Sequence, residues 1–205
     1  MNKFVTFEGG EGSGKSTLIK LLADYFEKNN VDFLATREPG GLEVCEEIRE
    51  IVKYSKNNLT PQAELLLFSA SRAELVHEVI EPALKSGKIV LCDRFFDSTR
   101  VYQGFCAGIE DETVMEITKF ATNGLVPTIT FFLDIDPKFA FERKGGKDKG
   151  DRIENKDFSF HENVRKGFLA LSQKERRFVV LDATKTPNEL LDEVVNTLKA
   201  KTLIR

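Results

Sequence analysis

Residues 9–17 read Gly-Gly-Glu-Gly-Ser-Gly-Lys-Ser-Thr, which matches the phosphate-loop pattern G-x-x-x-x-G-K-[ST]. An apolar run typical of a strand, Phe4–Phe7, comes just before it, and a run with helical spacing, Leu18–Leu22, follows. A glycine-rich loop in this position turns backbone N–H groups toward phosphate oxygens, and the helix N-terminus adds partial positive charge. Glycine-rich turns alone are usually structural, but the complete pattern with both flanking elements predicts a nucleoside triphosphate site.

The residue types within the loop each have a physical reason. Its glycines allow backbone conformations that a Cβ would forbid. We expect Lys15 to reach the β- and γ-phosphates and the Ser16 hydroxyl to ligate Mg²⁺. The residues expected to contact the triphosphate are Gly9, Gly10, Glu11, Gly12, Ser13, Gly14, Lys15, Ser16 and Thr17.

Length and composition limit the class of protein. The chain has 205 residues, of which 41% are hydrophobic and 31% charged, so we expect one globular domain over residues 1–205. The net charge of −3 does not favour nucleic acid as a partner. No apolar run is close to the length of about 18 residues that a transmembrane helix needs. The spacing of the three cysteines does not match that of metal ligands. We therefore expect a cytoplasmic protein that binds neither nucleic acid nor membrane.

Strand-like and helix-like patterns alternate along the chain. The expected strands are 3–7, 31–36, 89–92, 128–134 and 178–181, and the expected helices are 17–29, 43–53, 63–85, 110–122, 157–174 and 187–201. Nearly continuous apolar runs in the central strands are typical of parallel strands covered on both faces. We predict an α/β fold of P-loop NTPase type, a doubly wound five-stranded parallel sheet flanked by helices. In such sheets ligands bind at the carboxyl ends of the strands.

Charged residues follow two of these strands. Arg37 ends the second strand, and Asp93 and Arg94 end the third. Guanidinium groups match phosphate in a bidentate manner, so two arginines beside the phosphate loop favour anion binding, although a surface ion pair explains either one alone. Asp93 is a candidate Mg²⁺ ligand, directly or through water, and a helix cap or salt bridge is the alternative.

Phe68 and Arg72 are four residues apart on the predicted long helix and share one face. A phenyl ring beside a guanidinium suits a nucleobase, which stacks on the ring and accepts a hydrogen bond. A core phenylalanine with an exposed arginine is the alternative. Residues 144–151 read Lys-Gly-Gly-Lys-Asp-Lys-Gly-Asp, which fits either a solvated surface turn or a mobile cationic lid over the triphosphate, at about residues 143–152.

Together these motifs resemble a known family. The chain has Phe-Glu-Gly before the phosphate loop, Thr-Arg-Glu-Pro-Gly-Gly at 36–41, Leu-Leu-Phe-x-Ala-x-Arg at 66–72, Asp-Arg-Phe at 93–95, Tyr-Gln-Gly at 102–104 and Asp-Arg-Ile-Glu at 151–154. Their order and spacing are similar to those of bacterial thymidylate kinases, and the resemblance spans nearly the whole chain. It implies ATP and Mg²⁺ as cofactors, dTMP as the small-molecule substrate, and a homodimer.

The resemblance also implies roles for individual residues. Phe68 would stack on thymine and Arg72 would bond its O4, while Gln103, with Thr99 nearby, would meet the N3 edge. Tyr102 would pack under the deoxyribose and disfavour a 2′-hydroxyl. Glu11 would contact the 3′-hydroxyl. Arg37 and Arg94 would hold the acceptor phosphate, with Arg94 also reaching the donor.

The resemblance does not by itself identify which residue supplies the catalytic positive charge. One pattern in the family has an arginine in the phosphate loop where this chain has Gly12, whereas in the bacterial pattern the lid supplies the cation. Lys147 is our first choice, and Arg152 and Arg143 are rivals, with Arg143 also expected at the ATP site. Arg100 departs from the expected small apolar residue, without an explanation from the sequence. A kinase for another monophosphate, a nucleotide-dependent switch and a non-catalytic scaffold remain alternatives.

Overall fold

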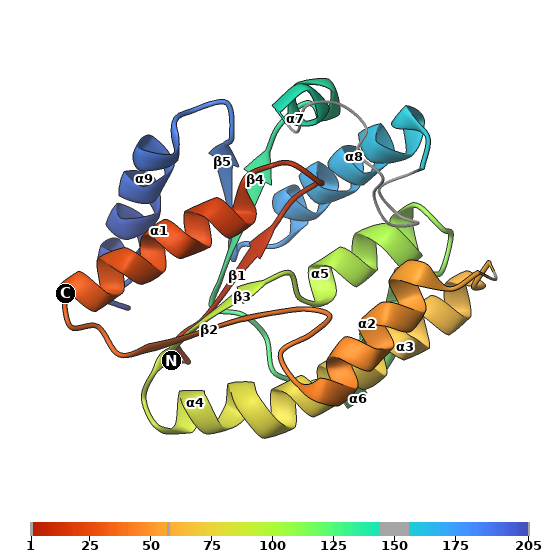
Figure 1. Cartoon of the computed structure of the whole chain (residues 1–205), viewed down its shortest axis with the longest axis horizontal. Helices are drawn as coiled ribbons and strands as arrows, with labels where there is room; N and C mark the ends of the chain where they lie inside the picture. The colour runs from red at the N-terminus through yellow and green to blue at the C-terminus, as the bar shows by residue number, and fades with distance from the viewer. Residues whose placement is uncertain (1, 57, 144–155, 205) are drawn as a thin grey trace.

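The computed structural model describes residues 2–56, 58–143 and 156–204, and its centre is a parallel five-stranded sheet (Figure 1). The strands lie in the order β2-β3-β1-β4-β5. Their bounds are β1 Phe4–Glu8, β2 Phe33–Arg37, β3 Ile89–Asp93, β4 Ile129–Asp134 and β5 Phe178–Asp182. Each expected strand is therefore present, with ends within two residues of the range expected from the sequence.

Helices cover both faces of the sheet, which confirms the predicted doubly wound α/β fold (Figure 1). In the described part of the chain, none of them is long and apolar enough to span a bilayer. The helices and π-helical segments (η) are α1 Lys15–Lys28, α2 Glu43–Tyr54, α3 Pro61–Leu75, η1 Val76–Ile80, α4 Glu81–Lys85, α5 Phe96–Thr99, η2 Arg100–Phe105, α6 Asp111–Ala121, α7 Pro137–Arg143, α8 Phe158–Lys174 and α9 Pro187–Ala200.

Alternate residues of β1 pack on opposite faces of the sheet, as strand geometry requires. Val5 and Phe7 join residues of α1 and α9 in one apolar cluster, whereas Phe4 packs with η1 and Phe95 on the other face. Because both faces are covered, every residue of β1 is buried. The nearly continuous apolar sequence of the central strands is the direct consequence.

Two helical regions differ from the expectation. The helix expected over 63–85 begins at Pro61 with Thr60 as its N-cap, and it passes through the π-helical η1 before it ends as α4. The sequence did not predict the helical run formed by α5 and η2, nor α7. Because α5 and η2 are buried on almost every side, they lack the amphipathic period that identifies surface helices.

The strand register brings several chain segments to one edge of the sheet. Phe7 of β1 pairs with Asp93 of β3, and Asp93 pairs with Arg37 of β2. The phosphate loop leaves β1 at this edge, and α5 and η2 begin just beyond β3. The residues expected to bind ligand therefore meet at the carboxyl ends of the strands.

Candidate active site

The phosphate loop folds around its own lysine. Gly14 has a left-handed φ of 94°, and α1 begins at Lys15. The ammonium group of Lys15 donates hydrogen bonds to the carbonyl oxygens of Gly9 (3.1 Å) and Gly10 (2.9 Å), and the side chain is almost fully buried. Burial, with the nearby Arg94 guanidinium, lowers the pKa of Lys15 to about 8. A phosphate beside this ammonium favours its charged form, so the loop suits an anionic ligand.

Gly12 occupies a position with no room for a side chain. Its φ is +72°, and a Cβ added there would lie 2.8 Å from the backbone oxygen of Ala140 in α7. By contrast, a Cβ added at Gly10 would meet no heavy atom of the described residues within 4 Å. The loop cannot carry an arginine at position 12 without moving α7, so the loop supplies no catalytic arginine at that position.

Ser16 and Asp93 meet between α1 and the end of β3. The Ser16 hydroxyl donates a hydrogen bond of 2.8 Å to the Asp93 carboxylate. This pair fits Mg²⁺, which prefers oxygen ligands and usually takes only one or two from the protein, with phosphate and water completing the set. Within the described ranges, no group of three or more His, Cys, Asp or Glu side chains is placed to hold a metal ion, in keeping with such a partial set.

Two cavities adjoin these residues. The acceptor cavity, as we name the first, has a volume of about 330 Å³ and lies between the phosphate loop, α2, α3 and the start of η2. The donor cavity, of about 720 Å³, lies between the phosphate loop and the segment leading into α9. Glu11, Lys15 and Ser16 line both of them, so the cavities meet at the loop.

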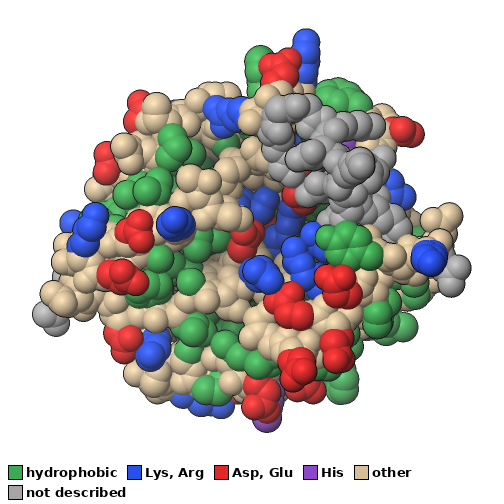
Figure 2. Space-filling model, in the orientation of Figure 1, with side chains coloured by type: hydrophobic (Ala, Val, Ile, Leu, Met, Phe, Trp, Pro, Cys, Tyr) green, Lys and Arg blue, Asp and Glu red, His purple; other side chains and the backbone are tan. Residues whose placement is uncertain are grey.

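The acceptor cavity is rich in cations. Figure 2 shows Lys and Arg side chains gathered in the hollow on this face of the molecule. Such a concentration of positive charge favours a ligand with an anionic group. Within the described ranges, the basic residues that line the cavity are Lys15, Arg37, Arg49, Lys53, Arg72 and Arg94.

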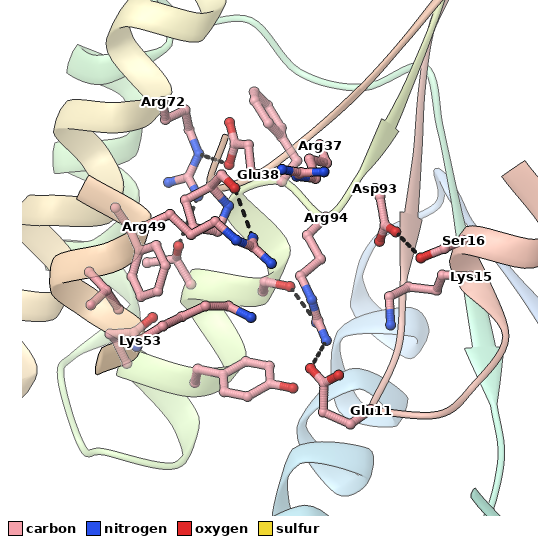
Figure 3. A pocket seen from close by; sticks show the side chains of 18 residues that line it. Glu11, Lys15, Ser16, Arg37, Glu38, Arg49, Lys53, Arg72, Asp93 and Arg94 are labelled. Atoms are coloured by element: carbon pink, nitrogen blue, oxygen red, sulfur yellow. Dashed lines mark hydrogen bonds and ion pairs between the residues drawn. The ribbon is translucent and has the colours of Figure 1, made fainter. Parts of the chain in front are cut away.

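Arg94 extends from the end of β3 toward the phosphate loop (Figure 3). Its φ of 68° is left-handed, a conformation that costs a residue with a side chain about 1–3 kcal/mol and that occurs often at functional sites. The guanidinium donates to the carbonyl oxygen of Gly9 (3.0 Å), the Ser98 hydroxyl (3.1 Å) and the Glu11 carboxylate (2.5 Å). Three acceptors therefore fix Arg94 in one orientation.

Arg72 is buried at the opposite end of the acceptor cavity. Its exposed fraction is only 2%, and its Nε lies 2.8 Å from the carboxylate of Glu38 (Figure 3). Another guanidinium nitrogen donates to the Thr99 hydroxyl at 3.0 Å. Phe68, on the same face of α3, is half-buried and lines the cavity. The alternative of a core phenylalanine with an exposed arginine is therefore wrong.

Tyr102 and Gln103 come from η2, and both line the acceptor cavity beside Thr99. The Gln103 amide donates a hydrogen bond of 2.9 Å to Glu64 of α3, and the Arg94 guanidinium lies 5.5 Å from the centre of the Tyr102 ring. The structure thus brings all the residues expected at the base and sugar to one cavity. π-Helical segments are found frequently at functional sites, and here one carries two of these residues.

Arg37 forms a surface ion pair in this structure. Its guanidinium lies 2.8 Å from Glu46, and its side chain is 55% exposed, although it also lines the acceptor cavity. Arg49 and Lys53 of α2 reach the same cavity (Figure 3). Neither was expected from the sequence, because basic residues on an amphipathic helix usually lie in solvent. Their spacing of four residues was the only available signal.

Several known proteins are similar to this chain in sequence and in fold. The family model described as thymidylate kinase matches residues 7–194. The chain belongs to the thymidylate kinase family. It is 48% identical over 189 residues to the thymidylate kinase of Pelodictyon phaeoclathratiforme, covering 87% of both chains. It is 41% identical over 202 residues to that of Finegoldia magna, covering 98% of this chain and 100% of the relative.

A solved structure agrees with this assignment. The crystal structure of thymidylate kinase from Ehrlichia chaffeensis matches with a TM-score of 0.76 and 34% identity, covering 95% of this chain and 97% of the other. The predictions of a bacterial-type thymidylate kinase, of the P-loop fold and of ATP and Mg²⁺ as cofactors are thereby confirmed.

Arg100, unexplained by the sequence, has structural partners in this member of the thymidylate kinase family. Its guanidinium donates to both carboxylate oxygens of Asp111, at 2.8 and 2.7 Å, and to Glu175 at 2.6 Å. Asp111 begins α6 and Glu175 follows α8. Arg100 therefore adds ion pairs between η2 and these two helical regions, which a small apolar residue could not form.

Most of the lid expected for a thymidylate kinase lies outside the described residues, including Lys147 and Arg152. Arg143 is described. It ends α7, donates hydrogen bonds to the carbonyl oxygens of Ala183 (2.7 Å) and Thr184 (3.3 Å), and lines the donor cavity. Its position suits contact with the donor nucleotide.

Proposed function

We propose that this protein transfers the γ-phosphoryl group of MgATP to dTMP, which gives ADP and dTDP. The observation that carries the proposal is the junction of the two cavities at Glu11, Lys15 and Ser16. Two nucleotides that enter from opposite sides would bring their phosphates together there, beside Arg94. Phosphoryl transfer needs little beyond such positioning and the neutralisation of charge, because its transition state is loose.

ATP occupies the donor cavity in this proposal. The loop residues 9–17 and the N-terminus of α1 receive the phosphates, and Lys15 leaves its carbonyl partners to contact the β- and γ-phosphates. Arg143, beside Ala183 and Thr184, contacts the nucleotide in the same cavity. Ser16 and Asp93 would hold Mg²⁺, directly or through water, and the bound ion would neutralise phosphate charge.

dTMP occupies the acceptor cavity with its base toward α3. Thymine stacks on Phe68, its O4 accepts from Arg72, and Gln103 with Thr99 meets its N3 edge. The buried Arg72 presents donors only, which favours a carbonyl at position 4 over the amino group of cytosine. Tyr102 packs beneath the sugar, at a place where a 2′-hydroxyl would need room.

The reacting phosphates lie between these two ends. Glu11 takes the 3′-hydroxyl of the acceptor, while Arg94 holds the acceptor phosphate and contacts the transferring group. Arg37 exchanges its partner Glu46 for the acceptor phosphate. Because the attacking group is already a phosphate oxygen, no strong general base is required. One lid cation, Lys147 or its rivals Arg152 and Arg143, completes the ring of positive charge.

A panel of acceptors tests the assignment. Purified protein with Mg²⁺ and ATP should phosphorylate dTMP faster than dUMP, dCMP, UMP, CMP or GMP, as ADP release reports. If the protein preferred another monophosphate, it would be a kinase for that nucleotide rather than for dTMP. Slow ATP hydrolysis that dTMP does not change would indicate a nucleotide-dependent switch. A rise in melting temperature with ATP, without any phosphorylated acceptor, would indicate a scaffold.

We also infer that the protein acts in the cytoplasm as a homodimer. The three cysteines are free thiols, which suits a reducing compartment. For the dimer, α3 packs against α2 and α6, and each carries an exposed apolar side chain: Ile51, Leu66 and Phe120, with exposed fractions of 49%, 58% and 91%. These side chains suit burial against a second copy.

Light scattering after size-exclusion chromatography tests the dimer. The protein should have twice the chain mass, and Leu66→Glu should give monomers. Val180→Glu on β5, which is 47% exposed in the free chain, is the matched control and should stay dimeric. A monomeric unmodified protein would contradict the inference. For location, fractionation of producing cells should leave the protein in the cytoplasmic fraction rather than with membranes.

A further inference from the structure

Glu8 is a buried carboxylate to which the proposed mechanism gives no role. It is the last residue of β1, directly before the phosphate loop, and its exposed fraction is 0%. One carboxylate oxygen accepts hydrogen bonds from the backbone N–H groups of Phe95 (2.8 Å) and Ser98 (3.3 Å). The other accepts from the Ser98 hydroxyl at 2.6 Å. The carboxylate thus holds the turn that follows Arg94.

The Ser98 hydroxyl connects Glu8 to Arg94. A hydroxyl has one proton to donate, and an ionised carboxylate can only accept. Since Ser98 donates to Glu8, its lone pairs remain for the guanidinium of Arg94, which donates to it at 3.1 Å. The same guanidinium nitrogen donates to the carbonyl oxygen of Gly9 at 3.0 Å. The charge of Glu8 therefore fixes which way the hydroxyl points and what it offers to Arg94.

The backbone carries a second connection between the two residues. Arg94 has a left-handed φ of 68°, which persists only where the surroundings hold it. Its own N–H donates to the carbonyl oxygen of Phe7, and the next N–H, of Phe95, donates to Glu8. The unusual conformation of Arg94 is thus held on both sides by the end of β1.

We propose that Glu8 is a positioning residue for Arg94. Glu8 acts through the Ser98 hydroxyl and the backbone of residues 94–95, and it directs the Arg94 guanidinium toward the junction of the two cavities. The inference rests on the proposed function, because Arg94 has its role in phosphoryl transfer there. An uncharged residue of the same shape would still fill the space, but it would not orient the hydroxyl.

The charge of Glu8 is sensitive to its neighbours. Burial, together with the Asp97 carboxylate, raises the pKa of Glu8 to about 7, and Arg94 opposes the rise. Asp97 itself accepts hydrogen bonds from Arg177 on both of its oxygens, at 2.5 and 2.7 Å. Among the described residues, Lys15, Cys92 and Tyr102 also interact electrostatically with Glu8.

A double-mutant cycle tests the proposal on the full chain. Glu8→Gln should lower kcat about 10–100-fold, the scale of a 1 Å misplacement, with a smaller increase in KM for dTMP, because Arg94 also holds the acceptor phosphate while the base pocket is untouched. In an Arg94→Lys background, Glu8→Gln should cost less than about threefold further, because its effect passes through Arg94. Equal losses in both backgrounds would overturn the proposal.

Two further variants separate positioning from general stability. Ser98→Ala removes only the hydroxyl and should reproduce most of the loss in kcat, which also covers the case in which Glu8→Gln does not fold. Asp97→Asn changes a carboxylate that is equally buried but bonded to Arg177, so at pH 8, where Glu8 is ionised with or without Asp97, the folded variant should keep kcat within about threefold. A similar fall in kcat for Asp97→Asn, or none for Ser98→Ala, would contradict the proposal.

The pH profile gives a readout that a space-filling role would not change. The ratio of kcat for the unmodified protein to that for Glu8→Gln should increase from pH 6 to pH 8, as Glu8 ionises. Titration of the substrate phosphates cancels in this ratio. A ratio that does not change with pH would overturn the proposal.

Crystal structures of the variants test the positioning role of Glu8 independently of the activity of the protein. In Glu8→Gln the Arg94 guanidinium should leave Ser98 and Gly9, whereas in Asp97→Asn it should stay. If the unmodified protein failed to phosphorylate dTMP, the proposed function would be wrong, and these structures would still show whether Glu8 orients Arg94. An unchanged Arg94 in the Glu8→Gln structure would refute the positioning role.

Discussion

The Arg72 guanidinium and the Glu38 carboxylate form an ion pair of 2.8 Å in which both side chains are buried, at one end of the acceptor cavity. Thr99 accepts from a second nitrogen of Arg72, and the third, Nη1, is buried without a hydrogen-bond partner among the described residues. A buried donor left unpaired costs about 1–3 kcal/mol, so the pocket gains from a ligand that supplies an acceptor.

Arg72→Ala should therefore weaken dTMP binding and relax base choice. A hydrogen bond from a charged group contributes about 1.5–3 kcal/mol, so KM for dTMP should increase about 10–100-fold, with less discrimination against dCMP. Steady-state kinetics with both acceptors measure this. Arg72→Ala also leaves Glu38 without its ion-pair partner. The double variant Arg72→Ala, Glu38→Gln, which removes both charges, therefore serves as a control for stability. Unchanged discrimination between the two bases would remove Arg72 from the base pocket.

Among the described residues, Lys15 donates hydrogen bonds to atoms of its own loop, the carbonyl oxygens of Gly9 and Gly10 and the Ser13 hydroxyl. Lys15→Ala should reduce kcat by at least about 10²–10³-fold, the scale for loss of one preorganised electrostatic contact, because charge on the moving phosphoryl group loses its partner. The melting temperature should stay near that of the unmodified protein, since a buried ammonium contributes little to stability. Residual activity above about one tenth would contradict the role given to Lys15.

Gly12 and Gly10 offer a matched pair of loop substitutions. Gly12→Ala should destabilise the protein by about 1–3 kcal/mol and weaken ATP binding, because φ is +72° and the added Cβ would meet the Ala140 backbone. Gly10→Ala should have little effect, since its Cβ would meet no atom in the part of the chain that the structure describes. Urea unfolding and ATP titration measure both variants. Equal behaviour of the two would show that the contact with α7 does not constrain the loop.

Much of this site could be predicted from the sequence, and the exceptions have physical reasons. The phosphate loop and the apolar strands are local patterns, so they identified the sheet and the donor side. Phe68 and Arg72 were placed on one face by helical spacing, but spacing does not show which of two side chains is buried. The burial of Arg72 depends on Glu38, which is far away along the chain and comes close only in the folded sheet.

A different reason explains why the sequence did not identify three residues of the site, Glu8, Arg49 and Lys53. Glu8 is a single carboxylate at the end of an apolar strand, and its partners Phe95 and Ser98 lie 87 and 90 residues away along the chain. Arg49 and Lys53 look like the polar face of an ordinary surface helix. Only the crossing of α2 over the acceptor cavity gives these two residues a place in the site.

Glu8 should also make stability depend on pH. Its pKa is raised from 4.5 to about 7 in the folded protein, so between these values the folded chain holds a proton that the unfolded chain does not. Its contribution to the free energy of unfolding is complete below pH 4.5 and is lost as the pH rises through 7. Since Glu8→Gln cannot titrate, its stability relative to the unmodified protein should increase over this window by on the order of 2–3 kcal/mol. Urea unfolding at several pH values measures the difference, and parallel curves would contradict it.

The lid cation is the least constrained part of the mechanism. A cation that contacts the transition state, like an arginine finger, contributes about 10³–10⁵-fold in rate, so Lys147→Ala should lower kcat several hundred-fold or more. The same substitution at Arg152 and Arg143 provides the comparison. A loss below about threefold for Lys147→Ala would move the role to whichever of these two shows the large loss.

The most direct measurement follows the phosphoryl group itself. Purified protein given Mg²⁺, dTMP and ATP labelled in its γ-phosphate should yield labelled dTDP, with one ADP formed for each dTDP and little ATP consumed when dTMP is left out. Labelled inorganic phosphate in place of dTDP, at a rate that dTMP does not alter, would contradict transfer between two nucleotides that meet at Lys15 and Arg94.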